Sequence, residues 1–140
     1  MKVIFDTNII IDVLLAREPF YHSAVQLFSE VLVGNVVGYL AATTITMVDY
    51  LLSKALTPIK AKAEIKKLLQ IFEIAPITHG VLESALSLSF KDYEDAVIHQ
   101  AGKMIGAEVI ITRDRVGFAK ANLSVYAPDE FLTLLRANKE

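Results

Sequence analysis

Aspartates follow predicted strands at two distant places in the sequence. The apolar run at residues 3–5 ends on Asp6, and the run at residues 109–111 is followed within three residues by Asp114. Short apolar runs bounded by polar residues are typical of buried strands. Parallel strands place their carboxyl ends on one edge of a sheet, where ligands bind. We therefore expect the Asp6 and Asp114 carboxylates to converge.

Two predicted helices bring further carboxylates. Asp92 and Asp95 stand at the start of a helix predicted over residues 93–105, three positions apart and therefore on one face. Asp49 lies in an otherwise apolar helix that we expect to begin at Thr43 or Thr44. Carboxylates gathered without partners repel one another. Because Mg²⁺ and Mn²⁺ prefer oxygen ligands, such an ion would offset that repulsion.

Each acidic residue also has a purely structural interpretation. Asp6, Asp92 and Asp95 would cap helices, Asp114 would end a turn, and Asp49 would pair with Lys54 or face water. Every one of these interpretations is reasonable alone, but a single metal site accounts for all of the acidic residues together.

Other catalytic and metal-binding patterns are missing from the sequence. The three histidines share no spacing typical of ligands, so we interpret them as ordinary surface or core residues. There is no cysteine, which excludes disulfides, zinc–thiolate sites and cysteine nucleophiles. We also find no glycine-rich phosphate loop and no Ser-His-Asp order.

Length, hydrophobic content and net charge limit the number of domains and the class of partner that this chain can bind. A chain of 140 residues is expected to form one domain, residues 1–140, with a real core. Its 54% hydrophobic content suggests a sheet covered on both faces or a buried oligomer contact. The net charge is −2, so a nucleic-acid partner would have to be held by a local patch or by metal ions. Asp6 and Asp12 interrupt the apolar amino terminus, which argues against a signal peptide or membrane span and for a cytoplasmic protein.

Strands and helices are predicted to alternate along the chain. The predicted strands are residues 3–5, 36–41, 72–75, 109–111 and 124–126. The predicted helices begin near residues 9, 20, 43, 58, 79, 93 and 128, and Thr57 and Thr78 are expected as N-caps. This alternation is typical of an α/β fold, a three-layer α/β/α sandwich around a mainly parallel sheet.

Four motifs resemble those of PIN domains, the metal-dependent ribonuclease fold of VapC-like toxins in bacterial toxin–antitoxin pairs. They are FDTNIIID at residues 5–12, TITMVDYLL at residues 44–52, KDYEDAVIHQAG at residues 91–102 and ITRDRVGF at residues 111–118. The closing APDEFL at residues 127–132 is also similar. The resemblance covers nearly the whole chain, and it implies a sheet of four or five strands and assembly as a dimer.

The resemblance implies which acids do the chemistry. Asp6, Asp49, Asp95 and Asp114 fall on the catalytic positions of the family. Asp6, Asp95 and Asp114 would bind Mg²⁺ or Mn²⁺, and Asp49 would bind directly or position the attacking water.

Supporting positions and two departures follow from the same resemblance. Asn8 and Thr112 fall on positions that orient the acids, and Asp92 would cap the helix that carries Asp95. The family usually has glutamate where Asp49 stands, so the metal contact of this shorter side chain would run through water. Gly117 replaces a further aspartate of some relatives, which implies one tightly held ion and a second ion only when the substrate supplies ligands.

On this basis we interpret the chain as a Mg²⁺- or Mn²⁺-dependent endoribonuclease, the toxin of a type II toxin–antitoxin pair. Its expected partners are RNA and a cognate antitoxin, and no membrane. Basic residues close to the acids are candidates for phosphate contacts, although each has an alternative as a plain solvated charge: Lys91, Arg113, Arg115 and Lys120.

Two other classes stay open at this point. One is a catalytically inactive PIN-like module that binds RNA or protein, which the replacement of glutamate by Asp49 and the presence of Gly117 would favour. The other is an aspartyl-phosphate or receiver-type domain, which also gathers acids around Mg²⁺ at strand ends. The receiver type needs a lysine at a late strand end, where this chain has residues 112–114 (Thr-Arg-Asp).

Apolar surface on two helices predicts a homodimer. The final helix carries Phe131, Leu132, Leu134 and Leu135, and the helix from Tyr21 to Val33 is also strongly apolar. Because one small sandwich does not obviously need both surfaces, we expect a second copy or an antitoxin segment to cover them.

Overall fold

A wholly parallel sheet of five strands forms the middle layer of the computed structural model, which describes residues 1–138. The strand order is β3-β2-β1-β4-β5, which confirms the predicted sheet. The last two residues of the domain predicted over 1–140 lie outside the described residues. The strands are β1 (Lys2–Phe5), β2 (Val37–Ala41), β3 (Glu73–Ala75), β4 (Val109–Ile111) and β5 (Ser124–Tyr126).

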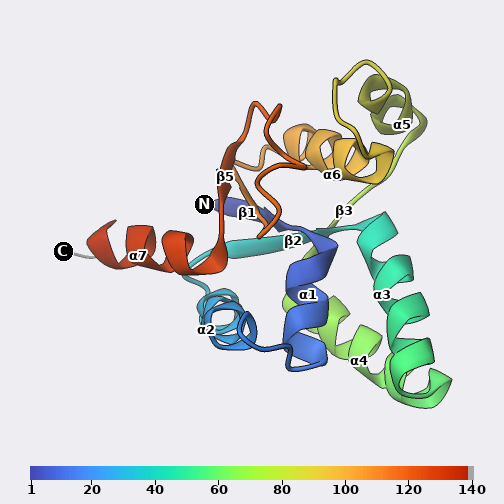
Figure 1. Ribbon diagram of the computed structural model, residues 1–140, viewed down its shortest axis with the longest axis vertical. Coiled ribbons are helices and arrows are strands. Elements are labelled where there is room, and N and C mark those ends of the chain that lie inside the picture. The colour runs from blue at the N-terminus through green and yellow to red at the C-terminus, as the bar shows by residue number, and fades with distance from the viewer. Residues whose placement is uncertain (139–140) are drawn as a thin grey trace.

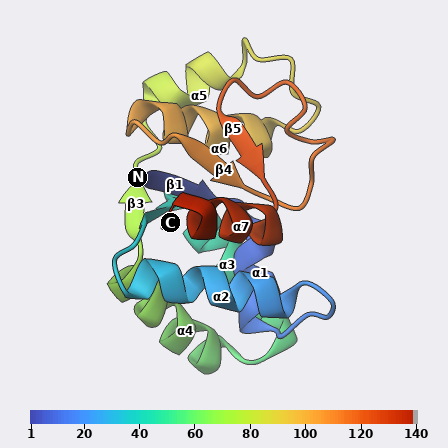
Figure 2. The same ribbon diagram turned by 90° about the vertical axis from the view of Figure 1, so that its left-hand side faces the viewer.

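Helices cover both faces of the sheet and complete the predicted three layers (Figures 1 and 2). Helices α5 and α6 lie on one face, and the other helices lie on the opposite face. No helix in the described part of the chain is long and apolar enough to cross a membrane. The helices are α1 (Thr7–Leu14), α2 (Tyr21–Leu32), α3 (Ala42–Ala55), α4 (Pro58–Ile71), α5 (His79–Ala85), α6 (Tyr93–Met104) and α7 (Pro128–Asn138).

Alternating side chains of β1 build the two halves of the core. Val3 and Phe5 face the side of α1, α2, α4 and α7, whereas Ile4 faces α5 and α6. The Phe5 ring packs edge-on against Phe28 and Phe72, with ring centroids 6.2 and 5.3 Å apart. Both faces of the sheet are therefore apolar, which explains the high hydrophobic content of the sequence.

Several helix boundaries follow local capping chemistry as predicted. Thr57 Oγ1 accepts a hydrogen bond from the Lys60 N–H at 3.2 Å, and Thr78 Oγ1 accepts one from the Val81 N–H at 3.2 Å. Pro58 occupies the first turn of α4, where its missing N–H costs nothing. These two starts could be identified from local sequence alone.

The predicted N-cap of α3 at Thr43 or Thr44 is wrong. The helix begins directly after β2 at Ala42, and its N-cap position, Ala41, makes no side-chain cap bond. Thr44 is fully buried instead, and its hydroxyl lies 3.0 Å from the Thr7 hydroxyl of α1.

Part of the surface that led us to predict a homodimer is used within the protomer. Phe131 is fully buried and Leu132 is 4% exposed, and Leu134 and Leu135 pack against the same core. Helix α7 lies against α2. Much of the apolar surface of these two helices is therefore used within the protomer, but Leu32 and Val33 remain 64% and 71% exposed, so the homodimer stays a prediction.

Candidate active site

The acidic residues meet where the order of the strands reverses. From β1 the chain builds β2 and β3 on one side of the sheet and then returns to add β4 and β5 on the other side. Asp6 follows β1, Asp114 follows β4, and the Asp6 N–H donates to the Ile111 carbonyl at 2.9 Å. In open α/β sheets, ligands bind in the crevice at this reversal, beyond the carboxyl ends of the strands.

Asp6 is buried and held by two hydrogen bonds. Its Oδ1 accepts from the Thr7 N–H at 2.8 Å, and its Oδ2 accepts from the Thr112 hydroxyl at 2.7 Å. Burial raises the pKa of Asp6 despite these bonds, and the neighbouring Asp114 raises it further. Asp6 is thus both the N-cap of α1 and a member of the acidic cluster, so the structural interpretation holds without excluding the functional one.

Thr112 joins the two strand-end acids. Its hydroxyl donates to Asp6 and accepts from the Asp114 N–H at 3.0 Å. This buried residue therefore has the orienting position predicted for it. Asn8, the other predicted orienting residue, is exposed and its side chain makes no hydrogen bond within residues 1–138, so its orienting role stays a prediction.

Gly117 lies between Asp114 and Asp95. Its N–H donates to Asp114 Oδ1 at 2.9 Å. A Cβ at this position would stand 2.5 Å from Asp114 Oδ2 and 3.0 Å from Asp95 Oδ2. The missing side chain thus allows the two carboxylates to approach the same main-chain segment.

Asp95, on the first turn of α6, shows most directly that the acids repel one another. Its half-buried carboxyl has its pKa raised to about 7, first by burial and then by Asp6, Asp92, Asp114 and Glu94. The three predicted metal ligands, Asp6, Asp95 and Asp114, therefore lie within electrostatic range of one another.

Asp92 is the cap of α6, as predicted. Its Oδ1 accepts from the Glu94 N–H at 2.9 Å, and no bond returns from Asp95 to the Asp92 N–H in the described chain. The carboxylate of Asp95 is therefore not used in a capping pair. Glu94, which we did not identify from the sequence, has its pKa raised by burial, by Asp92 and by Asp6. The sequence feature that could have identified Glu94 is its position directly before Asp95, where it adds a third acid to the pair of Asp92 and Asp95.

Asp49 does not join the cluster. Its Oδ1 pairs with Lys62 Nζ of α4 at 2.7 Å, and Asp49 is absent from the charges that raise the pKa of Asp95. The alternative partner Lys54 is also wrong, since its Nζ lies over the Tyr50 ring at 4.4 Å. A catalytic role for Asp49 therefore has no support in this geometry.

Arg113 forms an ion pair with a buried residue that we did not identify from the sequence. Its Nε and Nη2 donate to the two oxygens of the fully buried Asp12, at 2.8 and 3.2 Å. The guanidinium also stacks over Phe20 at 4.0 Å. The guanidinium is therefore already paired, its predicted phosphate contact stays a prediction, and its charge acts to lower the pKa of Asp6.

The other three basic candidates differ in their freedom to bind phosphate. Arg115 forms an ion pair with Glu130 at the start of α7, so its charge is partly neutralised. Lys91 and Lys120 are exposed and have no charged partner within residues 1–138. These two lysines remain candidates for contacts to a phosphate backbone.

The candidate ligands have the chemistry that a divalent ion prefers, but they are not arranged to hold one as they stand. The buried Asp6 and the half-buried Asp95, whose pKa values neighbouring acids raise, form the oxygen-rich, anionic environment that Mg²⁺ and Mn²⁺ stabilise. In the described residues, however, no group of three acidic or histidine side chains converges closely enough to hold an ion as it stands. Both oxygens of Asp6 and one oxygen of Asp114 each accept one hydrogen bond, which leaves a lone pair on each of these oxygens for an ion.

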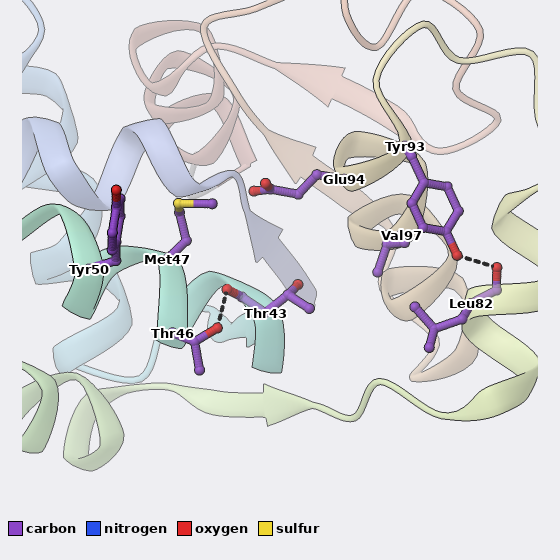
Figure 3. A pocket seen from close by; sticks show the side chains of 8 residues that line it. All are labelled: Thr43, Thr46, Met47, Tyr50, Leu82, Tyr93, Glu94 and Val97. Carbon is purple, nitrogen blue, oxygen red and sulfur yellow. Dashed lines mark hydrogen bonds between the residues drawn. The ribbon is translucent and has the colours of Figure 1, made fainter.

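An apolar pocket of about 530 Å³ adjoins the acids between α3, α5 and α6. Figure 3 shows Glu94 pointing from α6 toward Met47, and the Tyr93 hydroxyl donating to the Leu82 carbonyl at 2.6 Å. The pocket thus has an apolar floor with one carboxylate on the side of the acidic cluster. It is lined by Thr43, Thr46, Met47, Tyr50, Leu82, Tyr93, Glu94 and Val97.

The known proteins that this chain resembles are PIN-domain proteins and toxins of toxin–antitoxin pairs. Residues 2–116 match the PIN domain family. Ribonuclease VapC1 of Aquifex aeolicus is 30% identical over 135 residues, which cover 93% of this chain and 92% of that protein. The toxin–antitoxin complex from Klebsiella pneumoniae contains a chain with a TM-score of 0.69 and 23% identity, over 90% of this chain and 97% of that one. VapC20 of Mycobacterium tuberculosis, a toxin that cleaves the sarcin-ricin loop, gives a TM-score of 0.69 at 14% identity, over 84% and 93%.

Proposed function

Because the chain belongs to the PIN domain family, we propose that it is a metal-dependent endoribonuclease and the toxin of a toxin–antitoxin pair. The proposal treats residues 1–140 as a single nuclease domain that uses Mg²⁺ or Mn²⁺ to hydrolyse phosphodiester bonds of RNA. A relative named as a ribonuclease, matched over nearly its whole length, supports this activity.

The observation that carries the proposal is the gathering of three carboxylates at the reversal of the strand order. Asp6 and Asp114 follow β1 and β4, Asp95 lies in α6, and burial together with repulsion from the neighbouring acids raises the pKa of Asp95 to about 7. Maintaining such repulsion without a cation is unfavourable. A divalent ion relieves it, and a ribonuclease site explains why the acids are kept together.

The proposed roles follow from the contacts of each residue. Asp6, Asp95 and Asp114 would hold the ion, and Thr112 fixes the orientation of Asp6 through its hydroxyl. When bound, a divalent ion lowers the pKa of a coordinated water and offsets charge on the scissile phosphate. Lys91 and Lys120 would contact neighbouring phosphates and position the RNA chain across the site.

The test is cleavage of a single-stranded RNA by purified protein with Mn²⁺ or Mg²⁺. We expect cleavage that stops with chelator, returns with metal and is lost in Asp95→Asn. Lys62→Ala serves as the matched control because it frees Asp49 without touching the three acids. Undiminished cleavage by both Asp95→Asn and chelated protein would refute the mechanism.

A second candidate, RNA or protein binding without turnover, is favoured by one observation. Asp49, which resembles the second acidic position of the family, is withdrawn into an ion pair with Lys62. A protein that binds RNA in Mn²⁺ yet leaves it intact would support this candidate over the nuclease.

For the partner, we propose an antitoxin whose chain covers the apolar pocket next to Glu94. Support comes from relatives solved as toxin–antitoxin complexes and from the exposed rings of Tyr50 and Tyr93, at 54% and 44%. Co-expression with the product of an adjacent reading frame should yield a complex that Tyr93→Asp weakens. A complex unaffected by Tyr93→Asp would place the antitoxin elsewhere.

A further inference from the structure

His99 is a fully buried histidine outside the acidic cluster. The other two histidines pair at the surface, His22 with Glu18 and His79 with Glu83. From the sequence we interpreted all three as ordinary residues. The contacts of His99 set it apart, because they connect α6 with the segment that carries Asp114 and Gly117.

The hydrogen bonds of His99 fix its tautomer. Its Nε2 accepts from the Asn122 N–H at 3.1 Å, so the ring proton lies on Nδ1, which donates to Gln100 Oε1 at 2.9 Å. Gln100 Nε2 in turn donates to the Ser84 hydroxyl of α5 at 3.1 Å. Burial lowers the pKa of His99, so the ring is neutral at pH 7 and its Nε2 remains an acceptor.

The segment held by this ring has few other attachments. The main-chain hydrogen bonds of residues 115–121 stay within residues 114–121, in the described chain, and none reaches a helix. The first such bond to α6 is the one from the Asn122 N–H to His99. Apart from this bond, the ion pair of Arg115 with Glu130 and the burial of Phe118 attach the segment, so each of these contacts matters to its position.

Ring contacts reinforce the same connection. Phe90 packs against His99 at 5.3 Å between ring centroids and meets Phe118 edge-on at 5.7 Å. Phe118 is 2% exposed and follows Gly117 directly. The ring of His99 is therefore linked to the main chain beside Asp114 through two aromatic side chains.

Asp95 and His99 stand four residues apart, on one face of α6. The first lies against Gly117, within 3.0 Å of its missing Cβ, and the second holds Asn122. Helix α6 thus contacts the segment near both ends. The position of Asp114 relative to Asp95 depends on both contacts.

We propose that His99 is a positioning residue, which sets the separation of the Asp95 and Asp114 carboxylates by holding residues 115–122 against α6. This inference rests on the proposed function, because the two carboxylates that His99 would position are ligands of the proposed metal ion. It assigns a role to a buried group that the mechanism above does not use.

The experiment compares His99→Leu and His99→Gln in the full chain, far below the unfolding temperature. Leu removes the acceptor, whereas the Gln side-chain oxygen can occupy the place of Nε2. We expect His99→Leu to weaken Mn²⁺ binding, measured by calorimetry, about 10-fold. Amide exchange over residues 115–122 should accelerate in the same variant without metal. His99→Gln should restore both properties to within about 3-fold of the wild type.

Leu68→Ala is the matched control, since Leu68 of α4 is 1% exposed and lies on the opposite face of the sheet. It should lower stability while leaving Mn²⁺ affinity and the exchange of residues 115–122 unchanged. If His99→Leu does not fold, His99→Asn replaces it, because the shorter amide cannot reach the Asn122 N–H. An equal loss of Mn²⁺ affinity in Leu68→Ala, or none in the His99 variants, overturns the inference.

The same data separate this inference from the proposed function. A wild-type protein that binds no Mn²⁺ refutes the proposed metal site, and the exchange rates still decide whether His99 holds the segment. A wild type that binds Mn²⁺, with unchanged affinity and exchange in His99→Leu, refutes only the role of His99.

Discussion

At the scale of single residues, the buried charge of Asp12 is the least expected feature of the molecule. Its carboxylate is fully buried and pairs with Arg113 through two hydrogen bonds, whereas Arg17 approaches only to 3.9 Å. Removing one partner of a buried ion pair leaves the other charge uncompensated. We therefore expect Arg113→Ala to lower the free energy of unfolding by about 3 kcal/mol.

Arg17→Ala is the matched control for this prediction. The Arg17 side chain is 43% exposed, and its loss should cost less than about 1 kcal/mol. Urea unfolding of the two variants measures the difference directly. Equal losses would mean that Asp12 is not stabilised mainly by Arg113.

Asp95 should make the stability of the metal-free protein fall as pH rises. Its pKa is about 7 in the folded state, against an ordinary value of 3.8 for an aspartate in an unfolded chain, so the native state holds the proton more tightly over this range. The stabilisation is fully present below about pH 4 and is lost as pH rises through about 7. Thermal unfolding in chelator should therefore show a higher midpoint at pH 5 than at pH 8.

Two comparisons test the assignment of this pH dependence to Asp95. In Asp95→Asn the difference between pH 5 and pH 8 should shrink, because the group that gains the proton is gone. Adding Mn²⁺ to wild-type protein at pH 8 should raise the midpoint, as expected for a ligand that binds only the folded state. An unchanged pH difference in Asp95→Asn would assign the effect to another carboxyl.

Gly117→Ala should damage the site more than the fold. The new Cβ would overlap Asp114 Oδ2 at 2.5 Å, and a terminal carboxylate oxygen can rotate away more easily than the main chain can move. We expect Mn²⁺ affinity to fall while the midpoint of thermal unfolding changes little. Gly34→Ala, at a positive φ of 83° with open space around it, is the opposite control, since it strains the main chain far from the acids.

At the scale of helices and strands, local chemistry could be predicted from the sequence and tertiary pairing could not. Thr57-Pro58 indicated the start of α4 because a hydroxyl cap and a proline act within one turn. Thr44 also offered a hydroxyl cap, yet the junction of β2 and α3 buried it against Thr7. The proline after Thr57 is the local feature that Thr44 lacks, because Thr44 is followed by Ile45.

The same limit explains the outcome for the candidate site. Asp6 and Asp114 were identified because strand ends in a parallel sheet share one edge, a rule that needs no side-chain detail. Asp49 lies outside the cluster because it pairs with Lys62 of a different helix, a contact that local sequence does not reveal. The buried pair of Asp12 and Arg113 joins residues 101 positions apart, so no spacing in the sequence revealed it.

Helix α6 offers a test of capping against metal binding. Asp92 caps the helix through the Glu94 N–H, so Asp92→Ala should cost about 1 kcal/mol of stability. Mn²⁺ binding should survive, because Asp95 makes no capping bond of its own. Asp92→Asn is the control that keeps a cap and should retain nearly all the stability. Loss of Mn²⁺ binding in Asp92→Asn would mean that Asp92 is itself a ligand.

At the scale of the whole molecule, we still propose a homodimer, although much of the apolar surface of α2 and α7 is buried within the protomer. Large apolar side chains remain exposed around α5 and its neighbours, including Leu86 at 71% and Leu82 at 39%. Light scattering at micromolar concentrations should give twice the mass of one chain, and Leu86→Glu should reduce it. A monomeric wild type over that range would refute the dimer.

The strand order has a consequence for how the protein is made. The site draws Asp6 from the first strand to be synthesised, but Asp95 and Asp114 from the last third of the chain, inserted beside β1 only after β2 and β3 exist. A growing polypeptide that has reached residue 90 therefore carries one of the three acids. For a protein that destroys RNA, this order would keep the nascent chain harmless to the ribosome and message that are producing it. We expect a fragment of residues 1–90 to leave intact an RNA that the full chain cleaves.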